Sequence, residues 1–178
     1  MDPELETFVR ALKDRTEISD CIMTYCRGID RLDRALLESV YHPDALDDHG
    51  VFVGPADKFI DWVLDFHRNY QKRTMHLITT HRCELDGNSA HTESYYTYRA
   101  LNQTPPFYNH VTGRYLDRFE KRNGRWAIAE RICTVDISDE FLVADGAAAH
   151  APLLNGVRDK SDLSYRRPLK IDRSRFTV

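Results

Sequence analysis

The stretch "FYNHVTGRYLDRFEKRNGRWAIAERICTVDI" (residues 107–137) holds two runs rich in β-branched and aromatic residues, joined by the turn signal "RNG". Two similar runs precede it, "TMHLITTHRCEL" (74–85) and "SAHTESYYTYRAL" (89–101), and "DGN" and "NQTPP" separate the runs. Runs of this composition, bounded by glycine, proline and asparagine, are typical of β-strands. Four consecutive strands with short connections predict an antiparallel meander.

The first third of the chain has the pattern of amphipathic helices. Between Ile18 and Ile29, apolar residues recur at intervals of three and four, which predicts a helix that is buried along one side and ends near Asp30. The other elements expected are a short leading helix around residues 8–12, a helix from residue 33 that stops before Pro43, a short strand over 51–54, and a helix over 55–71 with proline at its first position.

Helices followed by an antiparallel sheet define an α+β fold, in which we expect the N-terminal helices to pack on one face of a curved antiparallel sheet. Such a sheet is a half-open barrel that encloses a pocket. The chain has 178 residues, 42% of them hydrophobic, which is the size of one globular domain. We assign residues 1–137 to this domain. Residues 138–178 form a C-terminal extension that would be either flexible or packed on a neighbouring subunit.

Charge and hydropathy argue against several classes of partner. The formal net charge is -3 and no block of Lys and Arg precedes the tail, so no nucleic acid is expected. The acidic N-terminus differs from a secretory signal, and no apolar run approaches the roughly 18 residues that span a bilayer. We therefore expect a cytoplasmic protein without membrane contact. The four cysteines lack CxxC spacing and are expected to be reduced packing residues.

The segment "YHPDALDDHG" crowds side chains that can bind a metal, namely His42, Asp44, Asp47, Asp48 and His49. Their spacing matches neither HExxH on a helix nor an EF-hand loop, so we expect no metal and interpret the aspartates as turn residues. The chain also lacks a GxSxG elbow and a glycine-rich phosphate loop. The chemistry that remains is proton transfer by a histidine that a carboxylate orients.

Three segments carry a resemblance to a known family: "YCRGIDRLDRALLESVYHPDALDDHGVFVGP" (25–55), "RTMH" (73–76) and "GRYLDRFEKRNGRWAIAER" (113–131). They resemble the SnoaL-like branch of the nuclear transport factor 2-like superfamily, whose members include scytalone dehydratase and hexachlorocyclohexane dehydrochlorinase. The resemblance covers roughly residues 5–137. It implies a cone-shaped α+β barrel with a deep pocket that needs neither a metal nor an organic cofactor.

The resemblance also implies a catalytic pair, Asp30 and His76. His76 would abstract a proton next to the bond that breaks, while Asp30 would orient the imidazole and stabilise it once protonated. His49 falls where scytalone dehydratase uses a tyrosine to polarise its substrate, and it is the third catalytic candidate. His81 is expected on the opposite face of the strand from His76, because five is an odd step along a strand.

Aromatic side chains are the expected substrate contacts. Tyr96 and Tyr98 share a face of their strand by alternation. Tyr115 and Arg131 match an aromatic wall position and an arginine of the dehydrochlorinase pocket, and Arg131 would stabilise a leaving anion or an enolate unless it only pairs with an acidic residue of a neighbouring strand. Tyr25 stands where the dehydrochlorinase has a lysine, so neither known substrate carries over directly.

The leading hypothesis is a cofactor-independent dehydratase-like lyase or isomerase for a small cyclic or aromatic substrate. Two alternatives remain: a non-catalytic protein that binds a small ligand, and an association domain with a filled pocket. An enzyme should hold Asp30 and His76 at hydrogen-bond distance in an enclosed pocket of roughly 300 Å³ or more. A homo-oligomer, either a dimer or a trimer, is expected in every case, because a partner commonly covers the open face of such a sheet.

Overall fold

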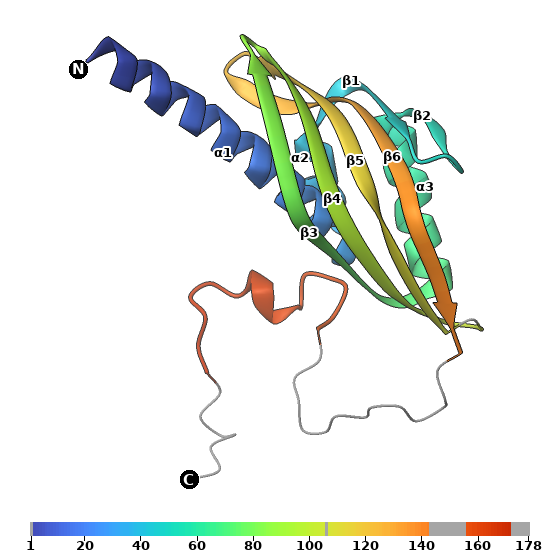
Figure 1. Ribbon diagram of the computed structural model, residues 1–178. Helices are drawn as coiled ribbons and strands as arrows, with labels where there is room; N and C mark the ends of the chain where they lie inside the picture. The colour runs from blue at the N-terminus through green and yellow to red at the C-terminus, as the bar shows by residue number, and fades with distance from the viewer. Residues whose placement is uncertain (1, 106, 143–155, 172–178) are drawn as a thin grey trace.

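Three α-helices cover one face of a six-stranded sheet within residues 2–105, 107–142 and 156–171, the part of the chain that the computed structural model describes (Figure 1). The sheet does not close into a barrel, and the expected α+β class with a cone-like, half-open sheet is confirmed. The elements are α1 (Pro3–Asp30), α2 (Arg34–Val40), β1 (Tyr41–Asp48), β2 (Val53–Pro55), α3 (Ala56–Tyr70), β3 (Gln71–Asp86), β4 (Ser89–Asn102), β5 (Tyr108–Arg122), β6 (Arg125–Phe141) and the short 3₁₀ helix η1 (Leu163–Tyr165).

The strand order β2-β1-β6-β5-β4-β3 contains the predicted meander. Strands β3 to β6 follow one another along the chain, and each neighbouring pair among them is antiparallel. The "DGN" and "RNG" turns place Gly87 and Gly124 at φ values of 57° and 79°, which glycine adopts at little steric cost. The prediction of an antiparallel meander is confirmed.

Helix α1 is one continuous helix, so the expectation of a separate leading helix was wrong. The residues between the two predicted helices include neither glycine nor proline, and nothing interrupts the backbone there. Asp2 caps the start by accepting a hydrogen bond from the backbone N–H of Glu4 at 2.9 Å. The helix ends at Asp30 as predicted, and its N-terminal part extends beyond the sheet (Figure 1).

The segment from Tyr41 to Asp48 is a strand, which corrects the expectation of a helix end and a turn. Helix α2 ends at Val40, and β1 then runs parallel to β6 and antiparallel to β2. Its register against β6 shifts between Tyr41 and Leu46, and this irregularity accommodates Pro43, which has no backbone N–H to donate. The sheet is therefore mixed rather than purely antiparallel.

The C-terminal part of the chain was the least predictable from sequence. Strand β6 continues to Phe141, past the boundary expected at residue 137. Residues 156–171 contact the end of α1 and the following loop in the same chain. Arg27 Nη2 of α1 donates to the Ser164 carbonyl at 3.3 Å, the Tyr165 hydroxyl donates to Asp33 at 2.7 Å, and Lys160 pairs with the same carboxylate. Residues 143–155 and 172–178 lie outside the described part, so the domain boundary and the packing on a neighbouring subunit stay predictions.

The hydrophobic core lies between the helices and the sheet. Helix α3 begins at Ala56, with Pro55 as the N-cap rather than the first helical residue. No helix among the described residues is long and apolar enough to cross a membrane, and the cytoplasmic location stays a prediction. The largest fully buried apolar side chains are Tyr25, Phe59, Tyr115, Phe119, Ile18, Ile22, Ile29, Leu37, Ile60, Ile128 and Val40.

Candidate functional site

The structure brings Asp30 and His76 together, although 46 positions separate them in the chain. The two side chains lie 2.7 Å apart between His76 Nδ1 and Asp30 Oδ1, and the backbone N–H of His76 donates to Asp30 Oδ2 at 2.9 Å. Both carboxylate oxygens are thereby engaged. A carboxylate at Nδ1 selects the tautomer that carries its proton there, so Nε2 of the neutral ring is unprotonated.

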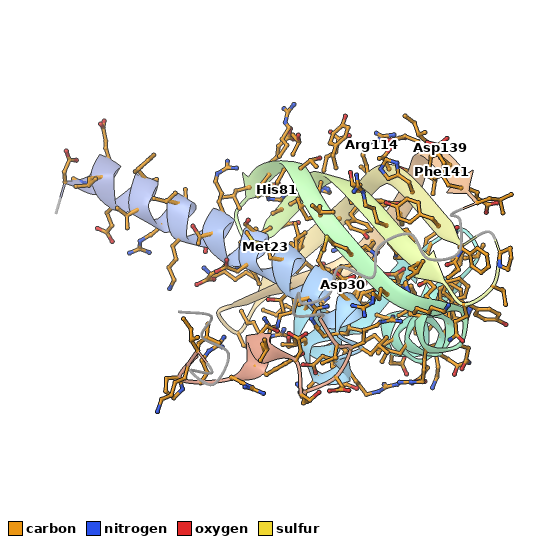
Figure 2. The ribbon with its side chains drawn as sticks, turned by 90° about the horizontal axis from the view of Figure 1, so that it is seen from below. Met23, Asp30, His81, Arg114, Asp139 and Phe141 are labelled. Carbon is orange, nitrogen blue, oxygen red and sulfur yellow. The ribbon has the colours of Figure 1, made fainter. Side chains whose placement is uncertain are left out.

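Helix α1 positions Asp30 as its final residue (Figure 2). Leu32 follows with a left-handed φ of 51°, which turns the chain out of the helix. A carboxylate at this end faces the negative pole of the helix dipole. Burial also acts to raise the pKa of Asp30, but the hydrogen bonds and charge of His76 outweigh it, and the net pKa is lowered. Asp30 is therefore ionised at neutral pH.

A cavity of about 190 Å³ lies beside this pair, between helices α1 and α3 and the concave face of the sheet. It is smaller than the roughly 300 Å³ that we expected. An apolar cavity of about 150 Å³ is known to accept benzene, so the space suits a compound with a single ring. Its lining includes Tyr25, His49, Trp62, Phe66, His67, His76, Tyr96, Tyr98 and Tyr115.

Four of the five expected substrate contacts line this cavity. Tyr96 and Tyr115 stack with ring centroids 4.5 Å apart, and Tyr25 meets Tyr115 edge-on at 5.5 Å. The Tyr98 ring lies 4.8 Å from the His76 ring. Tyr96 and Tyr98 lie on the same face of β4, as strand alternation predicted. The tyrosines give the cavity aromatic walls with few charges.

The fifth expected contact, Arg131, lies behind the wall and is not part of the cavity lining. Its guanidinium forms a bidentate ion pair with Asp117, at 2.6 and 2.8 Å, and both side chains are buried. The same guanidinium lies 4.1 and 4.3 Å from the ring centroids of Tyr25 and Tyr115. Arg131 therefore packs against Tyr25 and Tyr115 on the side away from the cavity. Its acidic partner is Asp117 of the neighbouring strand β5.

His49 forms a second histidine–aspartate pair on the cavity wall. Its Nδ1 is hydrogen-bonded to Asp47 Oδ1, and the other oxygen of Asp47 accepts from the Tyr41 hydroxyl at 2.6 Å. His49 Nε2 lies 3.3 Å from the Tyr25 hydroxyl, and its ring stacks on Phe59 at 4.4 Å. Burial acts to lower the pKa of His49, but the hydrogen bonds and charges of Asp47 and, second, of Cys133 outweigh this and raise the pKa to about 9. His49 is therefore a cation at neutral pH.

Sequence reasoning found His49 but missed Asp47, which it assigned to a turn. Asp47 is 1% exposed and carries no turn, since it pairs His49 with Tyr41 inside the core. Residues two apart on an extended segment point to the same side. An alternation test on residues 41–49 would therefore have placed Asp47 beside His49, had β1 been recognised as a strand.

His67 is a third histidine in the cavity lining, and its place on the buried stripe of α3 gave no sign of this. Burial lowers the pKa of His67 to about 3, with a smaller contribution from the charge of His76, so the ring is neutral. Its Nδ1 contacts Gln71 Oε1, while the Gln71 amide donates to the Tyr98 hydroxyl. This chain of contacts fixes the wall beside His76.

His81 lies on the same face of β3 as His76, which corrects the expectation that the two point apart. The register of β3 against β4 shifts between Ile78 and Thr80, where β3 has one extra residue that no residue of β4 pairs with. This β-bulge reverses the alternation of side chains after it, so that two residues five positions apart point to the same face. His81 lines a second hollow of about 570 Å³ between α1 and β3, together with Met23, Asp30 and His76. Figure 2 labels Met23 and Asp30 on α1 and His81 on the neighbouring strand. His76 thus borders both hollows, and Asp30 borders the second.

Apart from the Asp47–His49 pair, the possible metal ligands of residues 42–49 contact separate partners. The His42 ring contacts the Glu120 carbonyl at 2.9 Å, and Asp48 accepts from the backbone N–H of Gly50 at 2.8 Å. Asp44 pairs with Arg122. Across the part of the chain that the structure describes, no group of three or more His, Cys, Asp and Glu side chains is placed to hold a metal ion.

Comparison with known proteins identifies the family. The model of the SnoaL-like domain matches residues 10–132. A type 2 hexachlorocyclohexane dehydrochlorinase (LinA) superposes with a TM-score of 0.72 at 16% identity, covering 82% of this chain and 99% of that one. A proposed scytalone dehydratase from Novosphingobium aromaticivorans gives 0.68 at 15% identity, covering 75% and 91%.

A protein of unknown function from Mycobacterium tuberculosis gives a TM-score of 0.62 at 24% identity and covers 78% of this chain and 84% of its own. Likenesses at these identities establish the fold alone. No curated protein matches the chain. Because the family model spans residues 10–132, which is more than half of the sequence, the chain belongs to the SnoaL-like domain family.

Proposed function

We propose that the protein is a cofactor-independent lyase or isomerase acting on a small cyclic or aromatic compound. The observation that carries this proposal is one cavity bordered by two histidines, each paired with its own aspartate. His76 with Asp30 supplies a base, and His49 with Asp47 supplies a cationic acid. General acid–base catalysis needs both functions in one site.

His76 is the proposed base. Its Nδ1 is occupied by Asp30, so Nε2 is the nitrogen that can accept a proton from a substrate C–H bond in the cavity. As the ring becomes an imidazolium, the ionised Asp30 stabilises the new positive charge. Tyr98, packed 4.8 Å from the ring, keeps it oriented.

His49 is the proposed acid. Its Nε2 borders the cavity beside the Tyr25 hydroxyl, 3.3 Å away, so the cation can act directly or through that hydroxyl. Preorganised donors aimed at developing negative charge contribute strongly in a site shielded from water. His49 would thus stabilise an enolate or protonate a departing group.

The proposed reaction conserves protons and electrons without a further reactant. His76 Nε2 takes the proton, and the electrons of the C–H bond form a carbon–carbon double bond. In an elimination, the adjacent carbon–oxygen or carbon–halogen bond breaks with its electron pair on the leaving group, which the His49 cation stabilises or protonates. In an isomerisation, a proton returns at a different carbon.

Turnover of a panel of single-ring compounds tests this proposal. The panel pairs β-halo and β-hydroxy ring compounds, for elimination, with β,γ-unsaturated ring ketones, for isomerisation, and mass spectrometry in D₂O reports loss of the leaving group or deuterium uptake. The proposal expects at least one compound to be converted by the wild type. Binding of panel compounds with no conversion would favour the alternative of a non-catalytic binding protein.

The His49–Asp47 pair predicts a specific pH dependence. We expect the His49 ring to titrate near pH 9 in an NMR experiment, and the midpoint to fall in Asp47→Asn because the carboxylate that raises it is gone. A folded pKa above the unfolded value of about 6.5 stabilises the fold below pH 6.5, and this contribution is lost as the pH rises through 9. A midpoint that does not move in Asp47→Asn would contradict the pairing.

We also propose a homo-oligomer, formed through the projecting part of α1. Leu5, Phe8, Val9 and Leu12 form a stripe at helical spacing and are 47–63% exposed. This part of α1 extends beyond the sheet (Figure 1). Its first turn is acidic and basic residues follow from Arg10 onward, so two copies in antiparallel orientation would match apolar stripes and opposite charges.

This assembly predicts that Phe8→Gln/Leu12→Gln converts an oligomer into a monomer in light scattering after size exclusion. Leu77→Gln/Ile132→Gln is the matched control, because these side chains are 41% and 51% exposed on the outer face of the sheet. Dissociation of the control instead of the α1 variant would place the interface on the open sheet face and refute the α1 interface.

A further inference from the structure

A hollow of about 410 Å³ lies away from the tyrosine-lined cavity, between the segment that starts at Gly156 and the strands β3, β4 and β5. Four arginines line it, and its lining among the described residues includes no acidic side chain. We infer that this hollow binds a small, multiply charged oxyanion of the organic phosphate class. The four arginines are Arg31, Arg73, Arg99 and Arg158.

Neutral groups hold two of these arginines in place. Arg73 Nη1 donates to the Gly156 carbonyl at 3.2 Å. Arg158 Nη1 donates to the carbonyls of His67 and Gln71, at 2.9 and 2.8 Å. A carbonyl orients a guanidinium without cancelling its charge. The arginines are therefore positioned while their charges remain available to a ligand.

Among the described residues, three of the four arginines that line the hollow have no carboxylate partner. In the described ranges, Arg73, Arg99 and Arg158 have no carboxylate oxygen within 4.0 Å, whereas Arg31 has Asp162 at 3.6 Å. Nε and Nη2 of Arg158 are buried without a hydrogen-bond partner in the same ranges. Burying the Arg158 guanidinium without a counterion is unfavourable, and the protein as a whole carries a net charge of -3. A bound anion would relieve this local repulsion.

The shape of the hollow narrows the class of anion. Guanidinium groups match the geometry of phosphate oxygens and bind them through paired hydrogen bonds. Met75, Leu101 and Tyr108 supply apolar wall beside the arginines, which suits the organic part of a phosphate ester. The volume also falls in the range of roughly 300–1,000 Å³ that small-molecule sites occupy.

Calorimetric titration with pyrophosphate at constant ionic strength tests this site on the full chain. We expect Arg73→Gln/Arg99→Gln to weaken binding at least about tenfold, since each variant position removes a charge-assisted contact. Both side chains are exposed, so the double variant should fold. Arg34→Gln/Arg82→Gln is the matched control with the same change in net charge, made at exposed arginines paired with carboxylates elsewhere. Its affinity should equal that of the wild type.

Three results would overturn the inference: no measurable binding of pyrophosphate to the wild type, equal weakening in both double variants, or binding of a nucleic-acid polymer without binding of pyrophosphate. Equal weakening would mean that only the overall charge attracts the anion. None of these outcomes depends on turnover in the tyrosine-lined cavity. The test of the anion site is therefore independent of the test of the proposed function.

Discussion

Replacing His76 with glutamine is expected to lower kcat/KM for a converted panel compound by about 10²- to 10⁴-fold, the range that a positioned base contributes. Asp30→Asn should cause a loss of similar size while keeping the shape of the side chain. The amide cannot stabilise the imidazolium that forms when His76 takes the proton. Its NH₂ group would also favour the wrong tautomer of the ring.

The double variant shows whether the two residues act as one unit. Because each single change already disables the pair, Asp30→Asn/His76→Gln should be no slower than the worse single variant by more than a small factor. His91→Gln serves as the control, since His91 is exposed and away from the cavity. Full activity in His76→Gln, with the fold intact by thermal melting, would exclude His76 as the base.

Removing Arg131 is expected to have the largest effect on stability. Arg131→Met leaves Asp117 as a buried carboxylate without a partner, and breaking a buried ion pair in this way costs about 3–5 kcal/mol. Tyr25 and Tyr115 also lose the cation between their rings. Urea unfolding should show a large fall in the free energy of unfolding, together with weaker ligand binding as the tyrosine wall loosens.

Two further variants distinguish the effect of an unpaired buried charge on stability from the effect of lost packing. Arg131→Met/Asp117→Leu removes both charges and should recover much of the loss, because two apolar side chains leave nothing unpaired. Arg118→Met is the comparison at an ion pair that solvent reaches. Arg118 lies on the opposite face of the same strands and pairs with Glu130 at 2.8 Å. Its loss should be small. Equal losses in Arg131→Met and Arg118→Met would contradict the buried-pair account.

The sequence was sufficient for the parts of the fold that follow a regular period. The meander could be predicted because glycine, proline and asparagine mark its turns and β-branched and aromatic residues mark its strands. The end of α1 at Asp30 followed from a stripe with intervals of three and four. These two results place Asp30 at the end of a helix and His76 in the first half of a strand, and the family resemblance then pairs them.

The sequence did not predict the direction of side chains where an irregularity interrupts the regular alternation of a strand. The bulge in β3 between Ile78 and Thr80 moved His81 to the face of His76, and an odd-step argument assumes that no bulge exists. Pro43 indicated only the end of a helix, and the residues after it were interpreted as a turn, whereas residues 41–48 form a strand. That error hid Asp47. The burial of Arg131 behind the tyrosines depends on side-chain packing, which no local pattern reveals.

The tautomer of the neutral His76 ring is the most direct test of the proposed base. That role requires Asp30 to keep the proton on Nδ1, so that Nε2 has a lone pair that faces the cavity. Nitrogen-15 NMR of the histidine rings at a pH where His76 is neutral reports which nitrogen carries the proton. The account predicts the Nδ1–H tautomer in the wild type and its loss in Asp30→Asn. An Nε2–H tautomer in the wild type would contradict the account, because His76 would then have no lone pair to offer a substrate.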